Sequence, residues 1–475
     1  MDVTAALKSC LGPGGVLTDA ADLAGHIEDW RGRYTGPALC VALPRTTAEV
    51  AQVVRLCRDA GVPVLPQGGN TSLCGGAVPD AEGPAPVIVA LSRMRTVRSV
   101  DAVNNTMVVD GGCVLARVQE AARDAGRLYP VSLGAEGSCQ IAGTIATNAG
   151  GTGVLRYGNT RENVLGLEVV LPDGAIWDGL TALRKNNTGY DIKHLFIGSE
   201  GTLGIITGAT LKLHALPTAY AVAWIGLDSP EAALALLGRF QAACGARISG
   251  FELINRLQLD LVLANVPDRR NPLSGPHAWH LLVELSDSGT DAALATALEQ
   301  VLESALADGL VGDATIAASE TQRAALWEIR HSVSEANKKA GVGLTTDCAV
   351  PISAVPGFIA TATAAVQALV PDLPVIVVTH LGDGNVHFIP FFSFEQWAQV
   401  ADPEAMARRI RHTVNDISHA LGGTFSAEHG IGRTLVGEMA HYKSPVELAL
   451  MRSIKQAFDP DNRFNPGRLL PEPKA

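Results

Sequence analysis

Two histidines stand seven residues apart in the apolar stretch "VIVVTHLGDGNVHFIPFF", residues 375–392, on either side of an Asp-Gly pair. Asp383-Gly384 predicts a two-residue hairpin turn, because a type I′ turn needs positive φ at both central positions. Counting outward from this turn pairs His380 with His387 on one face, with Cβ atoms about 4.5 to 5.5 Å apart. The two imidazoles could share a divalent ion, or they could be core histidines bonded to backbone.

A carboxylate that could complete such a metal site occurs further along the chain. The short stretch "SAEHGIG", residues 426–432, offers Glu428 beside His429. Two imidazoles and one carboxylate leave coordination positions open, as catalytic zinc sites do. Manganese, cobalt and iron accept the same ligand types. His412 and His419 fall in a helical pattern and are expected to face solvent or a helix interface.

A group that could bind an anion is Arg330, in the segment "LWEIRHSVSEANKK", which reads as a helix. Arg330 falls within a stripe with Leu326, Trp327 and Val333, and Ser334 lies one turn further on the same face. A guanidinium can hold a carboxylate through two hydrogen bonds. An arginine in such a stripe can equally extend along apolar surface toward solvent. The residues alone leave both interpretations open.

Three glycine-rich loops occupy residues 66–79 ("PQGGNTSLCGGAVP"), 133–153 ("LGAEGSCQIAGTIATNAGGTG") and 184–204 ("RKNNTGYDIKHLFIGSEGTLG"). Such loops expose consecutive backbone N–H groups that can cradle a pyrophosphate. One such cluster alone would more often be a plain tight turn. No G-x-G-x-x-G motif follows the first strand, which disfavours a Rossmann dinucleotide site.

The elements that must position these groups follow from the hydrophobic periodicity. Residues 39–66 predict a strand, a helix and a second strand, and short strands alternate with glycine loops over 86–217. Helices over about 229–245 and 290–308, between apolar strands, predict an antiparallel sheet with helices on one face. The first helix has an apolar stripe, a threonine that can cap its start and a glycine that can end it: Val50, Val53, Val54, Cys57, Thr46 or Thr47, and Gly61.

Composition sets further limits on function. The 475 residues carry a net charge of −11 and no basic run, which argues against a nucleic-acid or anionic-membrane surface. The N-terminal "MDVTAALKSC" lacks the features of a signal peptide, and no run of about 20 apolar residues occurs. We therefore predict a soluble cytoplasmic protein. Its eight scattered cysteines are expected to be reduced packing residues.

The three loops, with "RYGNTRENVLGLEVVLPDG" and the histidine hairpin, resemble the D-2-hydroxy-acid dehydrogenases, above all the D-2-hydroxyglutarate dehydrogenases, over roughly residues 40–470. The resemblance implies an α+β fold of the vanillyl-alcohol oxidase type. It comprises a PCMH-type FAD-binding domain over 1–217 and a ferredoxin-like α+β substrate (cap) domain with the metal hairpin over 218–425. A C-terminal segment over 426–475 would close the active site and pack back on the FAD-binding domain.

The same resemblance implies roles for particular residues. His380, His387 and Glu428 would bind zinc or a similar metal, and His429 would be a catalytic base. Arg330 would be catalytic and would also bind the substrate, together with Ser334, Thr345, Ile389 and Asn385. The FAD would be non-covalent, because the first loop has no histidine to link it. The expected FAD-binding residues are Pro66, Gly68, Gly69, Asn70, Thr71, Ser72, Gly134, Gly137, Ser138, Gly143, Thr147, Asn148, Glu200, Gly204, Ile206 and Asn465.

The resulting hypothesis is FAD- and metal-dependent oxidation of a D-2-hydroxy acid to the 2-keto acid. Electrons would pass to an external acceptor such as an electron-transfer flavoprotein or a quinone, and a homodimer stays open. The alternative is one flavin subunit of a glycolate oxidase complex. A non-redox enzyme like the ether-lipid synthases fits poorly, because the hairpin and Glu428 point to hydroxy-acid chemistry. Thr345 and Ile389 replace a lysine and an asparagine of hydroxyglutarate enzymes, which favours a D-lactate-like substrate.

Overall fold

The computed structural model describes residues 2–471 of the chain, which forms two compact units. The first unit comprises residues 1–151, 157–216 and 428–475, and the second comprises residues 152–156 and 217–427. The segment limits expected from the sequence, after 217 and after 425, stay predictions about functional domains.

A four-stranded sheet opens the first unit in the order β1-β2-β4-β3, where β2, β4 and β3 are parallel and β1 is antiparallel to β2. Helix α3 connects β2 to β3 as the periodicity predicts. The Thr46 side chain accepts a hydrogen bond from the Glu49 N–H at its start, and Gly61 ends it with φ of 71°. The strands are β1 (Val16–Leu17), β2 (Cys40–Ala42), β3 (Val64–Gln67) and β4 (Val87–Ala90), and α3 is Thr47–Ala60.

A five-stranded antiparallel sheet completes the framework of the first unit, in the order β5-β6-β10-β8-β9. The strands are β5 (Val97–Asp101), β6 (Thr106–Asp110), β8 (Val164–Val170), β9 (Ile176–Gly179) and β10 (Ile205–Lys212), with a separate pair of β7 (Arg127–Leu128) and β11 (His214–Ala215). The remaining helices of this unit are α1 (Val3–Leu11), α2 (Ala20–Ile27), α4 (Leu115–Asp124), α5 (Ile141–Ala146), α7 (Lys193–Phe196), α16 (Val436–Tyr442) and α17 (Pro445–Phe458).

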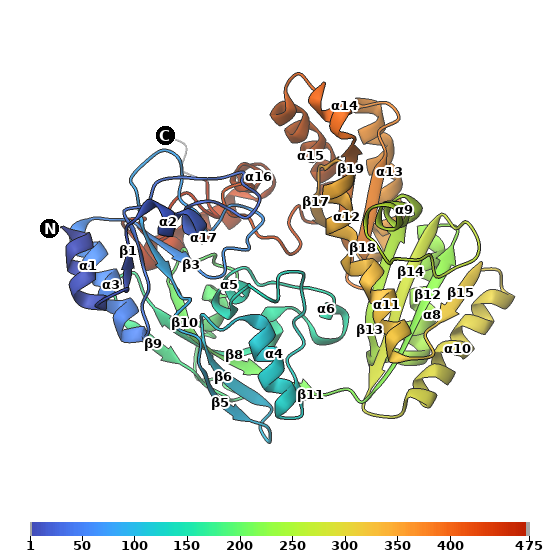
Figure 1. Cartoon of the computed structure of the whole chain (residues 1–475), viewed down its shortest axis with the longest axis horizontal. Helices are drawn as coiled ribbons and strands as arrows, with labels where there is room; N and C mark the ends of the chain where they lie inside the picture. The colour runs from blue at the N-terminus through green and yellow to red at the C-terminus, as the bar shows by residue number, and fades with distance from the viewer. Residues whose placement is uncertain (1, 472–475) are drawn as a thin grey trace. The chain divides into compact units, whose positions relative to one another are not determined.

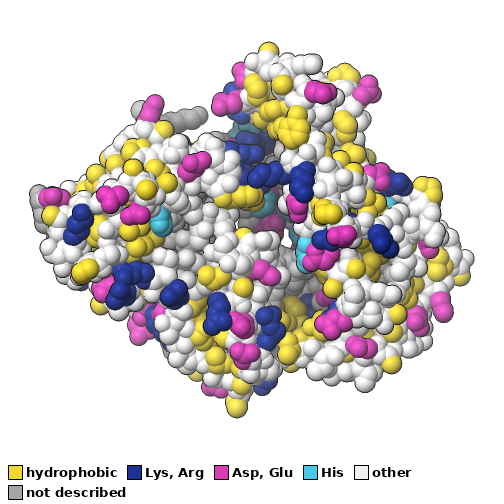
Figure 2. All heavy atoms as spheres, viewed as in Figure 1, with side chains coloured by type: hydrophobic (Ala, Val, Ile, Leu, Met, Phe, Trp, Pro, Cys, Tyr) yellow, Lys and Arg dark blue, Asp and Glu magenta, His cyan; other side chains and the backbone are white. Residues whose placement is uncertain are grey.

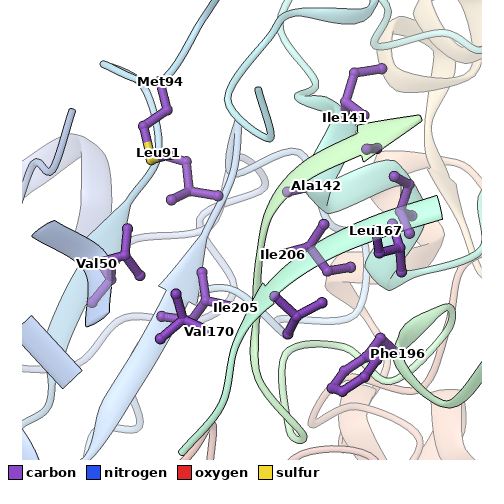
Figure 3. Close-up of a cluster of buried hydrophobic side chains, with 14 of the residues drawn as sticks. Val50, Leu91, Met94, Ile141, Ala142, Leu167, Val170, Phe196, Ile205 and Ile206 are labelled. Carbon is purple, nitrogen blue, oxygen red and sulfur yellow. The ribbon is translucent and has the colours of Figure 1, made fainter. Parts of the chain in front are cut away.

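The core of the first unit lies where α3 and α5 meet the strands of the second sheet (Figure 3). Val50 comes from α3, Ile141 and Ala142 from α5, and Ile205 and Ile206 from β10. Because α5 begins inside the second glycine loop and β10 follows directly after the third, this core fixes both loops at their ends.

The second unit is built on an antiparallel sheet of eight strands in the order β15-β12-β14-β13-β18-β19-β16, with β17 paired to β19. Figure 1 shows α13 and α15 beside β17 and β19, at the end of the sheet far from α10. The strands are β12 (Ala219–Leu227), β13 (Ile248–Asn255), β14 (Trp279–Asp287), β15 (Asp313–Ile316), β16 (Val342–Gly343), β17 (Thr346–Ala349), β18 (Val375–His380) and β19 (Asn385–Phe392).

Helices cover both faces of this sheet, whereas the sequence predicts them on one face. One apolar cluster includes residues of α8, α10, α13 and α15, and another, around Trp224 and Leu282, includes residues of α9, α11 and α12. The reason is that β12 and β14 bury successive residues, so both of their faces are apolar. The helices are α8 (Pro230–Cys244), α9 (Arg256–Asn265), α10 (Asp291–Ala307), α11 (Glu320–His331), α12 (Val333–Ala340), α13 (Val355–Leu369), α14 (Phe394–Ala398) and α15 (Pro403–Ala420), and α6 (Val154–Tyr157) lies at a unit limit.

One stretch of the described chain, Ile352–Leu369, is long and apolar enough to cross a membrane by length and composition alone. It corresponds largely to α13, which buries one side in the second unit: Val355, Pro356, Phe358, Ile359, Ala362 and Val366. That burial accounts for the apolar composition as a core helix does.

Acidic and basic side chains are interspersed over the face drawn in Figure 2. This distribution agrees with a chain whose net charge of −11 comes from scattered carboxylates.

Candidate flavin and metal sites

The first glycine loop begins at the end of β3 and contacts the second loop closely. A Cβ on Gly69 would lie 2.1 Å from the backbone oxygen of Ser138, so only glycine fits there. Asn70 has φ of 53°, and its side-chain amide donates to the backbone oxygens of Gly25 and Glu28. The Asn70 side chain therefore fixes the shape of the loop, and its backbone remains the part that a cofactor could contact.

Open space borders the second loop. An added Cβ on Gly134, Gly137 or Gly143 would meet no atom within 4 Å. Nearby, Gln140 Oε1 is buried and has no hydrogen-bond partner among residues 2–471. A loop with accessible backbone, an orphaned buried oxygen and a glycine contact at its base fits a flavin nucleotide.

Other predicted FAD-binding residues of the first two loops have local roles in the structure. Thr147 Oγ1 donates to the backbone oxygen of Gly143 at 3.0 Å. Asn148 has φ of 50° and accepts the backbone N–H of Arg161 through Oδ1 at 2.9 Å. Pro66, Thr71 and Ser72 are half-buried and Ser138 is exposed, all within the two loops that Gly69 joins.

The predicted residues around the third loop mainly hold protein contacts. Both Glu200 carboxylate oxygens accept backbone N–H groups, from Ile431 and Gly432, each at 2.7 Å. Burial raises the pKa of the Glu200 carboxyl, although these two N–H groups lower it. The Asn465 amide donates to the backbone oxygens of Gly76 and Glu200. These contacts attach the C-terminal segment to the first and third loops.

Gly204 and Ile206 serve the packing beneath the third loop. A Cβ on Gly204 would lie 2.8 Å from Val169 Cγ1, and Ile206 is only 4% exposed in the core. The motif that the sequence assigns to FAD is therefore partly a packing motif. Whether these residues also touch the cofactor stays a prediction.

The histidine hairpin has a different register from the predicted one. His380 pairs with Asn385 and Val378 pairs with His387, so the connection is the four residues Leu381–Gly384. Of the two predicted turn residues, only Gly384 has positive φ, at 82°. The turn is longer than predicted, and the Asp383 side chain accepts a hydrogen bond from the Asn385 N–H within it. The predicted direct pair of His380 with His387 is therefore wrong.

The two histidines nevertheless lie close together. A shift of two residues keeps side chains on the same face of an antiparallel pair, since strand side chains alternate with a period of two. The ring centroids of His380 and His387 are 5.5 Å apart. The two imidazoles therefore lie near each other on one face of the sheet, as the sequence predicts, although the register differs.

A buried carboxylate on the neighbouring strand β13 contacts His380. Glu252 Oε1 lies 2.7 Å from His380 Nδ1, and Glu252 Oε2 accepts from Arg330 Nε at 2.8 Å. Burial alone would raise the pKa of the Glu252 carboxyl, but His380 and Arg330 outweigh it and lower that pKa to about 2. A metal would have to be bound by His380 through Nε2, because Nδ1 is engaged with Glu252.

A second carboxylate, Asp347 of β17, lies opposite His387. The two residues pair across β17 and β19, with Asp347 Oδ1 at 3.7 Å from His387 Nδ1. Asn385 donates to the same Asp347 oxygen at 3.0 Å, and the Ala427 N–H donates to Asp347 Oδ2 at 3.1 Å. Asn385 therefore orients Asp347 and is 6% exposed, whereas the sequence assigns it to the substrate.

Glu428 and His429 directly follow Ala427, the last residue of the second unit. The ligand atoms of Asp347, His387, Glu428 and His429 all lie within 4.8 Å of one another. His429 Nε2 is 3.7 Å from Glu428 Oε1. Nitrogen and carboxylate donors at this spacing fit a divalent metal. Two predicted ligands, His387 and Glu428, belong to this group, and His380 adjoins it through its ring contact with His387.

Sequence reasoning missed Glu252 and Asp347. The available signals were a lone carboxylate in the apolar strand "ISGFELIN" and another in "TTDCAVP". A charged residue in an otherwise buried strand needs a partner, so each could have been marked as a candidate. Their histidine partners could not be named without the strand order β13-β18-β19 and the pairing of β17 with β19.

The predicted substrate residues have different environments. The helix carrying Arg330 ends at His331, and a new helix starts at Val333, so Ser334 does not continue the Arg330 stripe as predicted. Ser332 interrupts the helix because its hydroxyl donates to the Glu328 carbonyl. Ser334 and Thr345 are exposed, and Ile389 is 5% exposed in an apolar cluster.

The fold and the glycine loops together define an FAD-dependent oxidoreductase of the vanillyl-alcohol oxidase type. Solved structures share this fold. The chain superimposes on p-cresol methylhydroxylase with substrate bound with a TM-score of 0.74 and 15% identity, covering 98% of this chain and 96% of that one. For 4-ethylphenol oxidase from Gulosibacter chungangensis the TM-score is 0.74 at 18% identity, with 99% and 97% covered.

Two family models match the chain. The model described as "FAD linked oxidases, C-terminal domain" matches residues 216–469, and the one described as "FAD binding domain" matches residues 38–179. A D-2-hydroxyglutarate dehydrogenase of Xanthomonas citri pv. viticola is 38% identical over 455 residues, covering 95% of this chain and 93% of that protein. A mitochondrial D-2-hydroxyglutarate dehydrogenase of Bos taurus is 36% identical over 478 residues, covering 99% and 84%. The chain belongs to the FAD linked oxidase family that includes these dehydrogenases.

Proposed function

We propose that this protein oxidises a D-2-hydroxy acid to the corresponding 2-keto acid, using FAD and a divalent metal, and passes the electrons to an external acceptor. The observation that carries the proposal is the convergence of Asp347, His387, Glu428 and His429 within 4.8 Å. The relatives named D-2-hydroxyglutarate dehydrogenases support the substrate class.

The predicted site residues would have separate roles in this reaction. His380, His387 and Glu428 would hold the metal, and Arg330 would bind a substrate carboxylate through its guanidinium. A ring nitrogen of His429 would accept the proton of the 2-hydroxyl, as a neutral imidazole can near pH 7. When bound, the metal would supply Lewis-acid polarisation of the hydroxyl, and the flavin would supply a hydride acceptor.

The charge balance around Arg330 suits this role. Glu252 occupies the guanidinium through Nε, which leaves the two terminal nitrogens to face a carboxylate. The Arg330 side chain is 13% exposed, so a contact made there would be partly desolvated and therefore strong.

D-2-Hydroxyglutarate is the first substrate to test, with D-lactate as its main rival. The names of the relatives favour the former, while Thr345 and Ile389 favour the latter by residue type. Ile389 is buried in an apolar cluster, whereas Thr345 is exposed, so Thr345 would contribute more to the discrimination between these two substrates. Zinc is the expected metal, and manganese, cobalt or iron suit the same donors. An electron-transfer flavoprotein or a quinone would accept the electrons.

The alternative of one flavin subunit in a glycolate oxidase complex is less favoured, since relatives that match nearly the whole chain are named dehydrogenases. Reduction of an artificial dye by the purified single chain separates the two. We expect turnover with D-2-hydroxyglutarate or D-lactate that is lost in chelator and restored by zinc or manganese. Absence of turnover with every member of a panel that also holds D-malate, D-mandelate and glycolate would contradict the proposal.

A further inference from the structure

Glu252 is one carboxylate that contacts two residues with different tasks in the proposed function. One oxygen lies 2.7 Å from the Nδ1 of His380, a predicted metal ligand. The other accepts from the Nε of Arg330, the predicted substrate-binding residue, at 2.8 Å. Glu252 is 2% exposed, so both contacts are shielded from water.

We propose that Glu252 is a positioning residue that sets the metal-binding nitrogen of His380 and the guanidinium of Arg330 at the same time. The inference rests on the proposed function and names a residue that no sequence motif marks. Because a carboxylate only accepts hydrogen bonds, it requires a proton on His380 Nδ1, which leaves the Nε2 lone pair for a metal.

The backbone makes the contact with His380 a fixed one. Glu252 and His380 are direct partners across β13 and β18, and Glu252 also pairs with Leu282 on the other side. The carboxylate thus lies on a central strand with a hydrogen-bonded neighbour on each side. The backbone of Glu252 therefore cannot move away from that of His380 without breaking the ladder, so both side chains start from fixed positions.

Arg330 comes from α11, which a second buried carboxylate also contacts. Glu284 of β14 accepts from Trp327 Nε1 at 2.8 Å and from Ser249 Oγ at 2.8 Å. Trp327 lies three residues before Arg330 on the same helix, so Glu284 and Glu252 together fix the rotation of α11. The two carboxylates lie on adjacent strands, but only Glu252 contacts predicted site residues.

Charge gives a second reason for a carboxylate at this position. The Arg330 guanidinium carries a full positive charge, and a divalent metal held by His380 would add two more. Glu252 lies between Arg330 and His380 and offsets this repulsion. A neutral residue of the same shape would leave the guanidinium charge unopposed.

The test compares Glu252→Gln with the matched control Glu284→Gln. A glutamine at 252 has one acceptor for two donors, and its NH₂ group would favour a proton on His380 Nε2, the wrong tautomer for a metal. We expect zinc affinity of the FAD-loaded, metal-stripped protein, measured by competition with a chromogenic chelator, to fall about 10- to 100-fold. Glu284→Gln is expected to keep zinc affinity within about twofold, because Glu284 acts on packing.

The role of Glu252 toward Arg330 is tested by a double-mutant cycle. Glu252→Gln should raise the KM for the best substrate, and this increase should vanish in an Arg330→Ala background, since the residue being positioned is then absent. The loss of zinc affinity should persist in that background. An equal KM increase with and without Arg330 would overturn the Arg330 part of the proposal.

A third variant separates failure of this inference from failure of the proposed function. If His380→Ala binds zinc like the unmodified protein, His380 is not a metal ligand, and the role of Glu252 toward the metal falls with it, while the group of Asp347, His387, Glu428 and His429 stays available for the metal. If His380→Ala loses zinc while Glu252→Gln retains full zinc affinity and KM, only the positioning role is overturned. Should Glu252→Gln not fold, Glu252→Asp keeps the charge but is too short to reach both partners. It should then show about tenfold weaker zinc binding or higher KM, and unchanged values of both would refute the role.

Discussion

The three glycine loops of the first unit form the flavin cradle, and the contacts among Glu252, Arg330, His380, Asp347 and Asn385 form the polar network of the second unit. The two are built from different parts of the polypeptide. In the cradle, loops approach each other through glycine backbone, and predicted side chains such as Asn70 and Glu200 hold neighbouring segments. In the network, side chains from β13, β17, β18 and β19 contact one another. Shape defines the first site, and charge pairing defines the second.

This difference predicts two modes of failure. A substitution in the cradle acts by steric exclusion, because an added atom occupies the place of backbone or cofactor. A substitution in the network acts by leaving a buried charge or donor without its partner. Loss of turnover with the flavin still bound should therefore follow only from substitutions outside the cradle.

The largest effect is expected from removing a predicted metal ligand. His387→Ala or Glu428→Ala should lower dye-linked turnover by roughly a thousandfold, because the metal could no longer polarise the hydroxyl. The flavin absorbance should remain, since the cradle residues are untouched. His419→Ala, on the exposed side of α15, is the control and should keep its activity. Loss of flavin together with turnover in His387→Ala would break the proposed separation.

Two glycine substitutions probe the cradle next. A Cβ on Gly69 would lie 2.1 Å from the Ser138 oxygen, whereas one on Gly137 meets no atom within 4 Å. Gly69→Ala should therefore destabilise the apoprotein by about 1–3 kcal/mol and also weaken FAD binding. Gly137→Ala should leave the Tm of the apoprotein unchanged and weaken FAD binding alone, as judged by flavin fluorescence titration. Equal FAD affinity in Gly137→Ala and the unmodified protein would show that the cofactor does not approach this loop.

The same contrast explains how far the sequence could be read. Loop motifs such as "PQGGNTS" are local, so their presence in a cradle follows from neighbouring residues alone. The helix over 47–60 was also local, with its threonine cap and its glycine end. The contact of Glu252 with Arg330 joins residues 78 positions apart in the chain and depends on how α11 packs against β13, which no local pattern contains.

The hairpin shows an intermediate case. Its two strands and their shared histidine face were predictable from residue types, but the register was not, because Asp383 caps a longer turn through the Asn385 N–H. A two-residue shift preserves the face, so the chemical inference survived a wrong geometric one. A one-residue shift would have moved one histidine to the opposite face.

A smaller effect on stability is expected from Glu200, which holds the C-terminal segment against the third glycine loop. Both Glu200 oxygens accept N–H groups from Ile431 and Gly432, so Glu200→Gln would turn an NH₂ group toward one of these donors. We expect thermal unfolding to show a loss of about 1–3 kcal/mol. The zinc affinity of the folded protein should stay within about twofold, because no charge of the polar network changes. Unchanged stability would mean that the C-terminal segment is held mainly by Asn465 and its neighbours.

The smallest effect should follow from Thr345→Lys, because Thr345 is exposed between β16 and β17 and belongs to neither the cradle nor the buried network. A lysine there can extend without displacing packed atoms and would offer a positive charge to a second substrate carboxylate. We expect the ratio of kcat/KM for D-2-hydroxyglutarate over D-lactate to rise by about tenfold, which corresponds to roughly 1.4 kcal/mol. Thr345→Gln adds similar length without charge and should leave the ratio unchanged, so a rise in both variants would assign the effect to shape.

A rise in the lysine variant alone that shrinks at high salt would identify the effect as electrostatic, since exposed charges are screened. An unchanged ratio in Thr345→Lys would place selection for the substrate tail elsewhere, and Arg330 would then be the main carboxylate contact.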